Sequence, residues 1–126
     1  MFQIDNQSRQ AVYEQIVQQI ERYILTGVLK ANDKLPSVRN LSIELNVNPN
    51  TVQRAYTELE REKVIVTAVG RGAFVSENGI VELKERRVGM FLADLKKLVA
   101  ELILCGVEKE KIIAIINDQF KEDGSQ

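Results

Sequence analysis

The apolar residues near the start of the chain recur with the spacing of an amphipathic helix. Val12, Ile16, Ile20 and Ile24 follow one another every four residues, so they share one helical face. Gly27 then supplies a residue that tolerates the left-handed backbone at which helices commonly end. The pattern predicts a first helix that buries one stripe and stops at Gly27.

A second, shorter helix is expected after a turn-rich connection. Ser37 is a favourable N-cap, because its hydroxyl can accept a hydrogen bond from an amide of the first turn. Val38, Leu41 and Leu45 then lie at positions i, i+3 and i+7, which places them on one face. Asn46 tolerates a left-handed backbone and is the expected terminator.

The stretch NVNPNTVQRAYTELE, residues 46–60, predicts a third helix that starts abruptly. Asn48 can cap the helix, and Pro49 suits the first helical position because that position needs no amide donor. At a hundred degrees per residue, one face is apolar and faces the core, with Val52, Ala55, Tyr56 and Leu59. The opposite face and its flanks are polar, with Asn50, Thr51, Gln53, Arg54, Thr57 and Arg61.

The connection between the second and third helices is short enough for a helix-turn-helix. The second helix of that motif presents its N-terminal turns to the major groove of DNA. Asparagine and glutamine side chains can pair with adenine there, and arginine can pair with guanine. Three acidic residues, Glu58, Glu60 and Glu62, cluster at the far end of the helix, where they would least oppose phosphates. The pattern therefore favours a DNA-reading helix.

A β-hairpin is expected after the third helix. Two runs rich in β-branched and aromatic residues, Val64–Val69 and Ala73–Ser76, flank the sequence GRG. Gly70 and Gly72 allow a tight turn with Arg71 at its tip. Such a wing lies along the minor groove, where arginine is favoured when the groove is narrow. The same segment lacks the third glycine of a phosphate-binding loop, so nucleotide binding is not expected.

The remainder of the chain predicts two helices separated by Gly106. A heptad seam runs through Val88, Phe91, Leu95, Leu98, Leu102 and Cys105, and Leu92, Val99 and Ile103 widen it. The shorter final helix is apolar at Ile112, Ile113, Ile116 and Phe120. Cys105 is interpreted as a small buried apolar residue. The two helices carry more apolar surface than they can bury against each other, which favours a core shared between two chains.

Composition limits the alternatives. The 126 residues are 44% hydrophobic and 28% charged, as in a folded protein, and the net charge of −1 argues against a non-specific polyanion binder. With no histidine and one cysteine, neither a metal site nor a catalytic constellation is expected, and no cofactor is implied. The chain offers neither a signal peptide nor an apolar run of membrane-spanning length, so we expect a cytoplasmic protein and no membrane partner.

From Tyr13 to Ser76 the chain resembles the winged-helix domain of the GntR family of bacterial transcription regulators. The resemblance is carried by KLPSVR (34–39), VNPNTVQRAY (47–56) and GRGAFVS (70–76). The short helical tail resembles the YtrA-type subfamily, which implies homodimerisation and often regulation of an ABC-transporter operon. The expected fold is α+β and mostly α, with a winged helix-turn-helix domain at 1–77 and a two-helix dimerisation region at 78–126.

The resemblance also implies which residues contact double-stranded DNA. Matching positions are Arg39, Asn48, Asn50, Thr51, Gln53 and Gly70. The pattern of residues adds Arg54 and Arg71, with Ser37, Lys34 and the helix-start amides as phosphate contacts. The expected dimer contacts are Val88, Phe91, Leu92, Leu95, Leu98, Val99, Leu102, Ile112 and Ile116. The chain departs from the family at Ala11, where proline is favoured, at Asn32, within the usual PGD, and at Lys63, where glycine is usual.

Other interpretations remain open. The polar face of the third helix is alternatively a solvated surface on which Arg54 pairs with Glu58 four residues on, a contact worth about 0.3–0.5 kcal/mol. Ser37, Arg39, Lys34 and Arg71 have similar alternatives as a simple cap or as surface residues. The expected function is a homodimeric regulator, a repressor or activator, on a palindromic operator. The alternative is a winged-helix scaffold that binds another protein. A small ligand could lodge between the tail helices, but no polar cluster there points to one, so the presence of an effector stays open.

Overall fold

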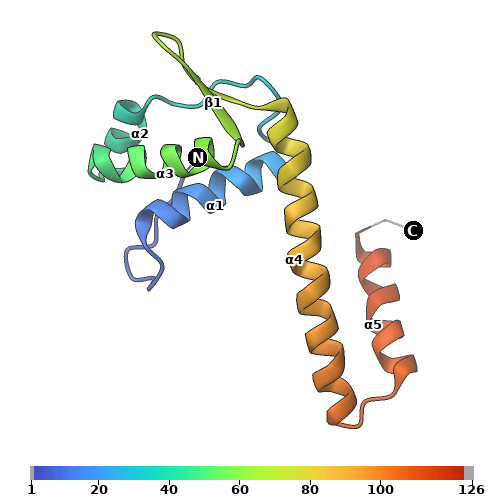
Figure 1. Cartoon of the computed structure of the whole chain (residues 1–126). Coiled ribbons are helices and arrows are strands. Elements are labelled where there is room, and N and C mark those ends of the chain that lie inside the picture. The colour runs from blue at the N-terminus through green and yellow to red at the C-terminus, as the bar shows by residue number, and fades with distance from the viewer. Residues whose placement is uncertain (1, 124–126) are drawn as a thin grey trace. The chain divides into compact units, whose positions relative to one another are not determined.

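The computed structural model describes residues 2–123, and the chain divides into two compact units, Met1–Arg86 and Arg87–Gln126. Five helices and one hairpin make up the described residues (Figure 1). Their bounds are α1 Val12–Leu25, α2 Val38–Leu45, α3 Pro49–Arg61, β1 Ile65–Ala68, β2 Gly72–Val75, α4 Glu77–Leu104 and α5 Lys109–Glu122. The first unit therefore contains a helix-turn-helix followed by a wing.

The core of the first unit is built from the predicted apolar faces. The stripe of α1 is buried at Ile16, Ile20 and Ile24, and α1 packs against α3. Helix α3 contributes its predicted apolar face, which is buried at Val52, Ala55, Tyr56 and Leu59. The expected division at Glu77 falls at the first residue of α4, but the compact unit extends to Arg86 because the first turns of α4 add the fully buried Leu83 to this core.

The ends of α2 and α3 confirm the predicted caps. The Ser37 hydroxyl accepts a hydrogen bond from the amide of Asn40 at 3.0 Å, and the Asn48 side chain accepts one from the amide of Asn50 at 2.8 Å. Asn46 ends α2 in the left-handed region, with φ of 54°. Each cap gives a partner to one amide that has no acceptor within its own helix, and the left-handed Asn46 sets the short connection between α2 and α3.

The end of α3 is closed by a non-glycine residue in a left-handed conformation. Lys63 has φ of 63°, its amide donates to the carbonyl of Glu60, and the amide of Val64 donates to the carbonyl of Leu59. This pair of hydrogen bonds is a Schellman motif, which usually places glycine at the left-handed position. Asn32, with φ of 71°, is similarly left-handed. Two of the three departures from the family pattern thus fall where the backbone favours glycine or asparagine.

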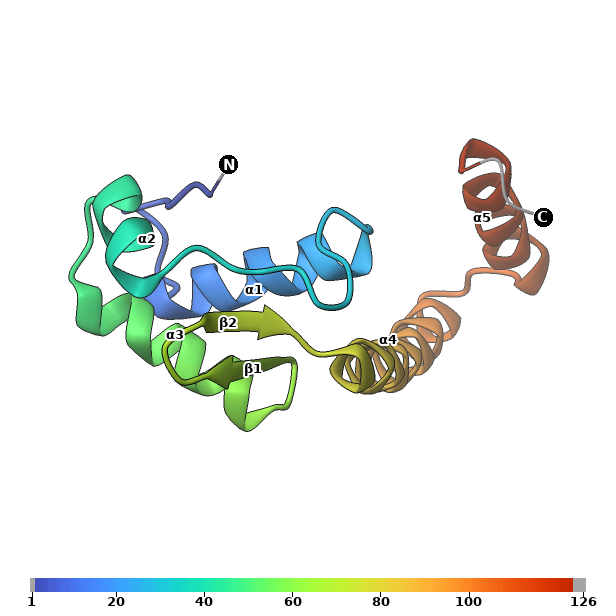
Figure 2. The same cartoon turned by 90° about the horizontal axis from the view of Figure 1, so that it is seen from above.

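The wing is an antiparallel hairpin that receives a third segment along its other edge. Strands β1 and β2 lie side by side (Figure 2), and Ala68 pairs with Gly72 at the turn. Gly70 has φ of 76°, and the Arg71 amide closes the turn on the Ala68 carbonyl at 2.9 Å. On the outer edge of β2, the amide of Leu35 donates to the carbonyl of Ala73 at 2.9 Å. The chain before α2 is therefore held along the outer edge of β2.

The second unit consists of the part of α4 that follows Arg86 and the whole of α5. The chain reverses between the two helices at Gly106, whose φ is 81°. Most of its apolar side chains are solvent-exposed in the single chain; among them are Val88, Phe91, Leu92, Leu95, Leu98, Leu102, Ile113, Ile116 and Phe120. The prediction that Cys105 is buried is wrong for this single chain. Cys105 is exposed because it lies after the last residue of α4, where nothing covers it among the described residues.

Among residues 2–123, no helix combines the length and the apolar character that a membrane crossing needs.

Candidate nucleic-acid interface

The outer face of α3 is an exposed polar surface on a rigid support. Asn50, Gln53 and Arg54 are exposed, and Thr51 is partly buried. The opposite face of the same helix is buried in the core, so the rotation of α3 about its axis is fixed. The sequence predicted this division of faces, and the structure confirms it. The first turns of α3 can therefore present donors and acceptors to base edges.

The backbone at the start of α3 is already hydrogen-bonded within the helix. Pro49 has no amide, the amide of Asn50 donates to the Asn48 side chain, and the amide of Thr51 donates to the Asn48 carbonyl at 2.9 Å. These groups are therefore not available as free phosphate donors in this conformation. At this end of α3 the candidates for contact with DNA are therefore side chains, not these backbone amides.

Arg54 is held by an aromatic ring from another helix. Its guanidinium carbon lies 3.9 Å from the centroid of the Tyr13 ring, on α1. The alternative partner, Glu58, instead accepts hydrogen bonds from Arg61, which hold the pKa of the Glu58 carboxyl below its ordinary value. The expected alternative, a pair between Arg54 and Glu58, is not the arrangement seen, and no sequence spacing within α3 pointed to Tyr13.

The start of α2 is tied to α3 by a tyrosine hydroxyl. Tyr56 donates to the carbonyl of Pro36 at 2.6 Å. Burial raises the pKa of this phenol, and the negative charge of Glu44 raises it further, so the hydroxyl remains a donor across the ordinary pH range. Ser37 follows Pro36 directly, Arg39 lies two residues after Ser37, and both are exposed. The hydrogen bond thereby positions the N-cap Ser37 and Arg39 of α2, the two candidate phosphate contacts, relative to α3.

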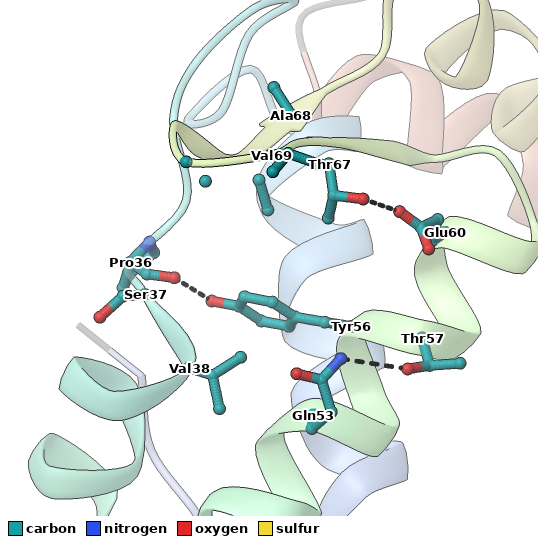
Figure 3. A pocket seen from close by; sticks show the side chains of 13 residues that line it. Pro36, Ser37, Val38, Gln53, Tyr56, Thr57, Glu60, Thr67, Ala68 and Val69 are labelled. Carbon is teal, nitrogen blue, oxygen red and sulfur yellow. Dashed lines mark hydrogen bonds between the residues drawn. The ribbon is translucent and has the colours of Figure 1, made fainter.

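A groove of about 310 Å³ separates α3 and the start of α2 from the wing (Figure 3). Ser37, Gln53 and Gly70 line it, which brings together candidate residues from three segments. The amide of Gln53 donates to the Thr57 hydroxyl at 3.2 Å, and the Thr67 hydroxyl donates to the Glu60 carboxylate (Figure 3). The second contact joins β1 to α3, and no local pattern predicts it, because Thr67 and Glu60 lie on different elements.

Two further cations lie near the turn of the wing, one from the wing itself and one from the segment before α2. Arg71 is exposed beside Gly70, as predicted. The Lys34 side chain lies close to the turn end of the hairpin, since its Cε is 3.0 Å from the position that a Cβ on Gly72 would take. Lys34 also pairs with Phe74 across the outer edge of β2. The structure therefore places Lys34 beside the wing. None of the four candidate cations lines the groove; these are Lys34, Arg39, Arg54 and Arg71.

Three helices, a short turn within the helix pair, and a two-stranded hairpin define a winged helix-turn-helix protein. Residues 12–75 match the profile described as "Bacterial regulatory proteins, gntR family". The match spans half of the chain, and the chain belongs to this family.

Similar proteins cover nearly the whole chain, tail included. The HTH-type transcriptional repressor YtrA of Bacillus subtilis (strain 168) is 47% identical over 112 residues, which cover 89% of this chain and 86% of that protein. A transcriptional regulator from Oenococcus oeni, known from its crystal structure, is 43% identical with a TM-score of 0.78, covering 93% of this chain and 97% of that one.

A GntR family transcriptional regulator from Listeria monocytogenes is 38% identical with a TM-score of 0.73, covering 91% of this chain and 98% of its own. Together with the family match, these relatives show that the chain is a transcription regulator and not an enzyme.

Proposed function

We propose that the chain is a cytoplasmic repressor that binds a two-fold symmetric DNA operator as a homodimer. The observation that carries the proposal is the exposed polar face of α3, fixed from behind by the core and flanked by the wing. A helix presented in this way fits the major groove, and a hairpin at its side fits the adjacent backbone and minor groove.

The candidate residues divide into two groups by chemistry. Positive and hydroxyl groups on the flanks suit phosphates, which supply affinity without reading sequence. These are Ser37, Arg39, Lys34 and Arg71. Side chains on α3 suit base edges, since amides pair with adenine and arginine pairs with guanine. These are Asn50, Gln53 and Arg54, with Asn48, Thr51 and Gly70 completing the surface between the two groups.

The second unit supports the homodimer. The heptad positions of α4 are largely exposed in the single chain, with Phe91 at 56% and Leu98 at 61% of full exposure. A continuous apolar surface of this kind is expected to be covered by a partner, and a heptad seam is suited to a second copy of itself. The proposed dimer contacts are Val88, Phe91, Leu92, Leu95, Leu98, Val99, Leu102, Ile112 and Ile116.

The proposed sign of regulation is taken from a relative, and the proposed target genes from the resemblance of the tail to the YtrA-type subfamily. The Bacillus subtilis relative at 47% identity is named a transcriptional repressor, and we extend that sign of regulation to this chain. The tail of YtrA-type proteins implies an ABC-transporter operon as the target. We also propose that the chain represses its own gene, so that an operator lies in the DNA upstream of that gene.

A mobility shift on the DNA upstream of the chain's own gene tests the proposal. We expect sequence-selective binding that weakens as salt concentration rises, because phosphate contacts release counterions. Selection of random duplexes by the purified protein should recover a palindrome. A folded protein that selects no sequence would contradict operator binding and favour the alternative, a scaffold for another protein.

Arg54→Ala tests the assignment of the reading helix within the proposal. The loss of one bidentate contact is expected to cost about 1–3 kcal/mol and to relax preference at one position in each half-site. Binding titrations against the selected operator and its single-base variants measure both quantities. Equal affinity and equal preference in the variant would remove Arg54 from the set of base-reading residues.

A further inference from the structure

We infer that Tyr13, a residue of α1 outside the helix-turn-helix, is a positioning residue for sequence reading through its contact with Arg54. The inference rests on the proposed function, because it assigns the orientation of a side chain that reads bases in that proposal. The ring of Tyr13 lies beneath the Arg54 guanidinium, with 3.9 Å between its centroid and the guanidinium carbon. A cation within about 6 Å of a ring centroid is attracted to the face of the ring.

The contact leaves the hydrogen-bonding capacity of Arg54 intact. A guanidinium is planar and directs its N–H groups outward in that plane, so a ring on one face blocks none of them. The guanidinium is also not diverted to the nearest acid of its own helix, because Glu58 is hydrogen-bonded to Arg61. Arg54 is thus exposed, charged and held on one side by an uncharged surface.

Tyr13 is itself fixed in place. It is partly buried and packs against the core of the first unit. Two residues further along α1, the buried Gln15 fastens the preceding segment: its side-chain carbonyl accepts from the amide of Asp5 at 2.9 Å, and its amide donates to the carbonyls of Asp5 and Gln10 at 3.0 and 3.1 Å. The first turn of α1 is thus tied to the core and to the segment before it, and it serves as a platform under Arg54.

A long arginine side chain loses conformational freedom when it binds a base edge, and a preformed orientation reduces that loss. The platform on α1 thereby supports selectivity at one base pair per half-site without touching DNA. A contribution of this kind is expected to act through Arg54 alone. It should disappear when Arg54 is removed.

A double-mutant cycle tests the inference. Tyr13→Leu removes the ring face but keeps an apolar side chain, and Tyr13→Phe keeps the ring and removes only the hydroxyl. We expect Tyr13→Leu to weaken operator binding by about two- to fivefold and to relax preference at the position that Arg54→Ala relaxes. Tyr13→Phe should match the wild-type protein. The double variant Arg54→Ala with Tyr13→Leu should bind like Arg54→Ala alone.

The salt dependence of binding separates positioning from a structural role. Because Tyr13→Leu keeps every charge, the slope of log affinity against log salt should be unchanged while the base preference changes. Uniformly weaker binding to all sequences, or additive losses in the double variant, would overturn the inference. Nuclear magnetic resonance of the wild-type protein provides an independent measurement. The ring current of Tyr13 is expected to shift the resonance of the Arg54 side-chain N–H upfield. A resonance without this upfield shift would equally overturn the inference.

The outcomes distinguish this inference from the proposed function. A wild-type protein that selects no DNA sequence contradicts the proposed function. A wild-type protein that selects an operator, with a loss in Arg54→Ala but none in Tyr13→Leu, contradicts only the role of Tyr13.

Discussion

The backbone of Gly79, in the first turn of α4, lies directly against the backbone of Lys63 at the end of α3. A Cβ placed on Gly79 would lie 2.1 Å from the carbonyl oxygen of Lys63 and 2.8 Å from the Cα of Val64. No side chain fits into that space without moving one of the two segments. This close approach joins the start of α4 to the turn that precedes the wing.

Gly79→Ala is expected to destabilise the first unit even though alanine favours a helix. The steric overlap with Lys63 should cost about 1–3 kcal/mol of the free energy of unfolding. Gly89→Ala, in the middle of the same helix, is the matched control, since no atom lies within 4 Å of its added Cβ. That variant should gain about 0.5–1 kcal/mol. Urea denaturation of both variants measures the change in the free energy of unfolding. Equal changes at the two sites would contradict the close packing of Gly79 against Lys63.

Lys63→Gly is expected to raise the stability of the protein. Lys63 has φ of 63°, a conformation that costs a residue with a Cβ more than it costs glycine. The greater freedom of glycine in the unfolded chain offsets part of the gain, which leaves roughly 0.5–1 kcal/mol. Lys63→Ala removes the same charge but retains the strain, so it should change stability little. The melting temperatures of the wild-type protein and the two variants test this prediction. A higher melting temperature in both variants would mean that the lost charge, and not the backbone conformation, raises the stability.

Arg71→Ala is expected to weaken DNA binding without changing the preferred sequence. Loss of one wing contact to the backbone should reduce the salt slope by about one. Arg22→Ala removes an exposed charge from the last turn of α1, outside the proposed interface, and is the control for net charge. Titrations at several salt concentrations measure the slopes. A similar loss in both variants would mean that overall charge, not the wing, governs affinity.

Leu98→Glu is expected to dissociate the proposed homodimer. Leu98 lies on the heptad seam, and a buried unpaired carboxylate there should weaken association by at least about tenfold. Ala100→Glu adds the same charge two residues further along, where the heptad pattern places the side chain away from the seam; Ala100 is exposed. Sedimentation equilibrium compares the two. A monomeric wild-type protein, or equal dissociation in both variants, would count against this dimer surface.

Local patterns in the sequence were sufficient to predict most of the first unit. Asn48 and Pro49 specify the start of α3 through chemistry within one helical turn, and the four-residue spacing of Ile16, Ile20 and Ile24 specifies the buried stripe of α1. The wing followed from Gly70 and Gly72 in the same way. Each of these predictions depends on neighbours close in sequence, which is why the structure confirms them.

Contacts between distant segments were not predictable from the same patterns. Arg86 pairs with Glu62 at 2.9 Å and with Glu21 at 3.4 Å, joining the start of α4 to α3 and α1. Arg54 finds Tyr13 on another helix instead of the acid one turn away. Cys105 was expected in a core that a single chain does not provide. Such partners depend on tertiary placement, and one sequence contains no local signal for them.

The self-contained hydrogen bonding at the start of α3 has a consequence for how regulators of this type can diversify. Asn48 and Pro49 complete the helix end internally, whereas the side chains of Asn50 and Gln53 are exposed and lie outside the core. If Asn50 and Gln53 read bases as proposed, gene duplicates can exchange this pair and acquire new target promoters while the architecture that displays them is inherited unchanged.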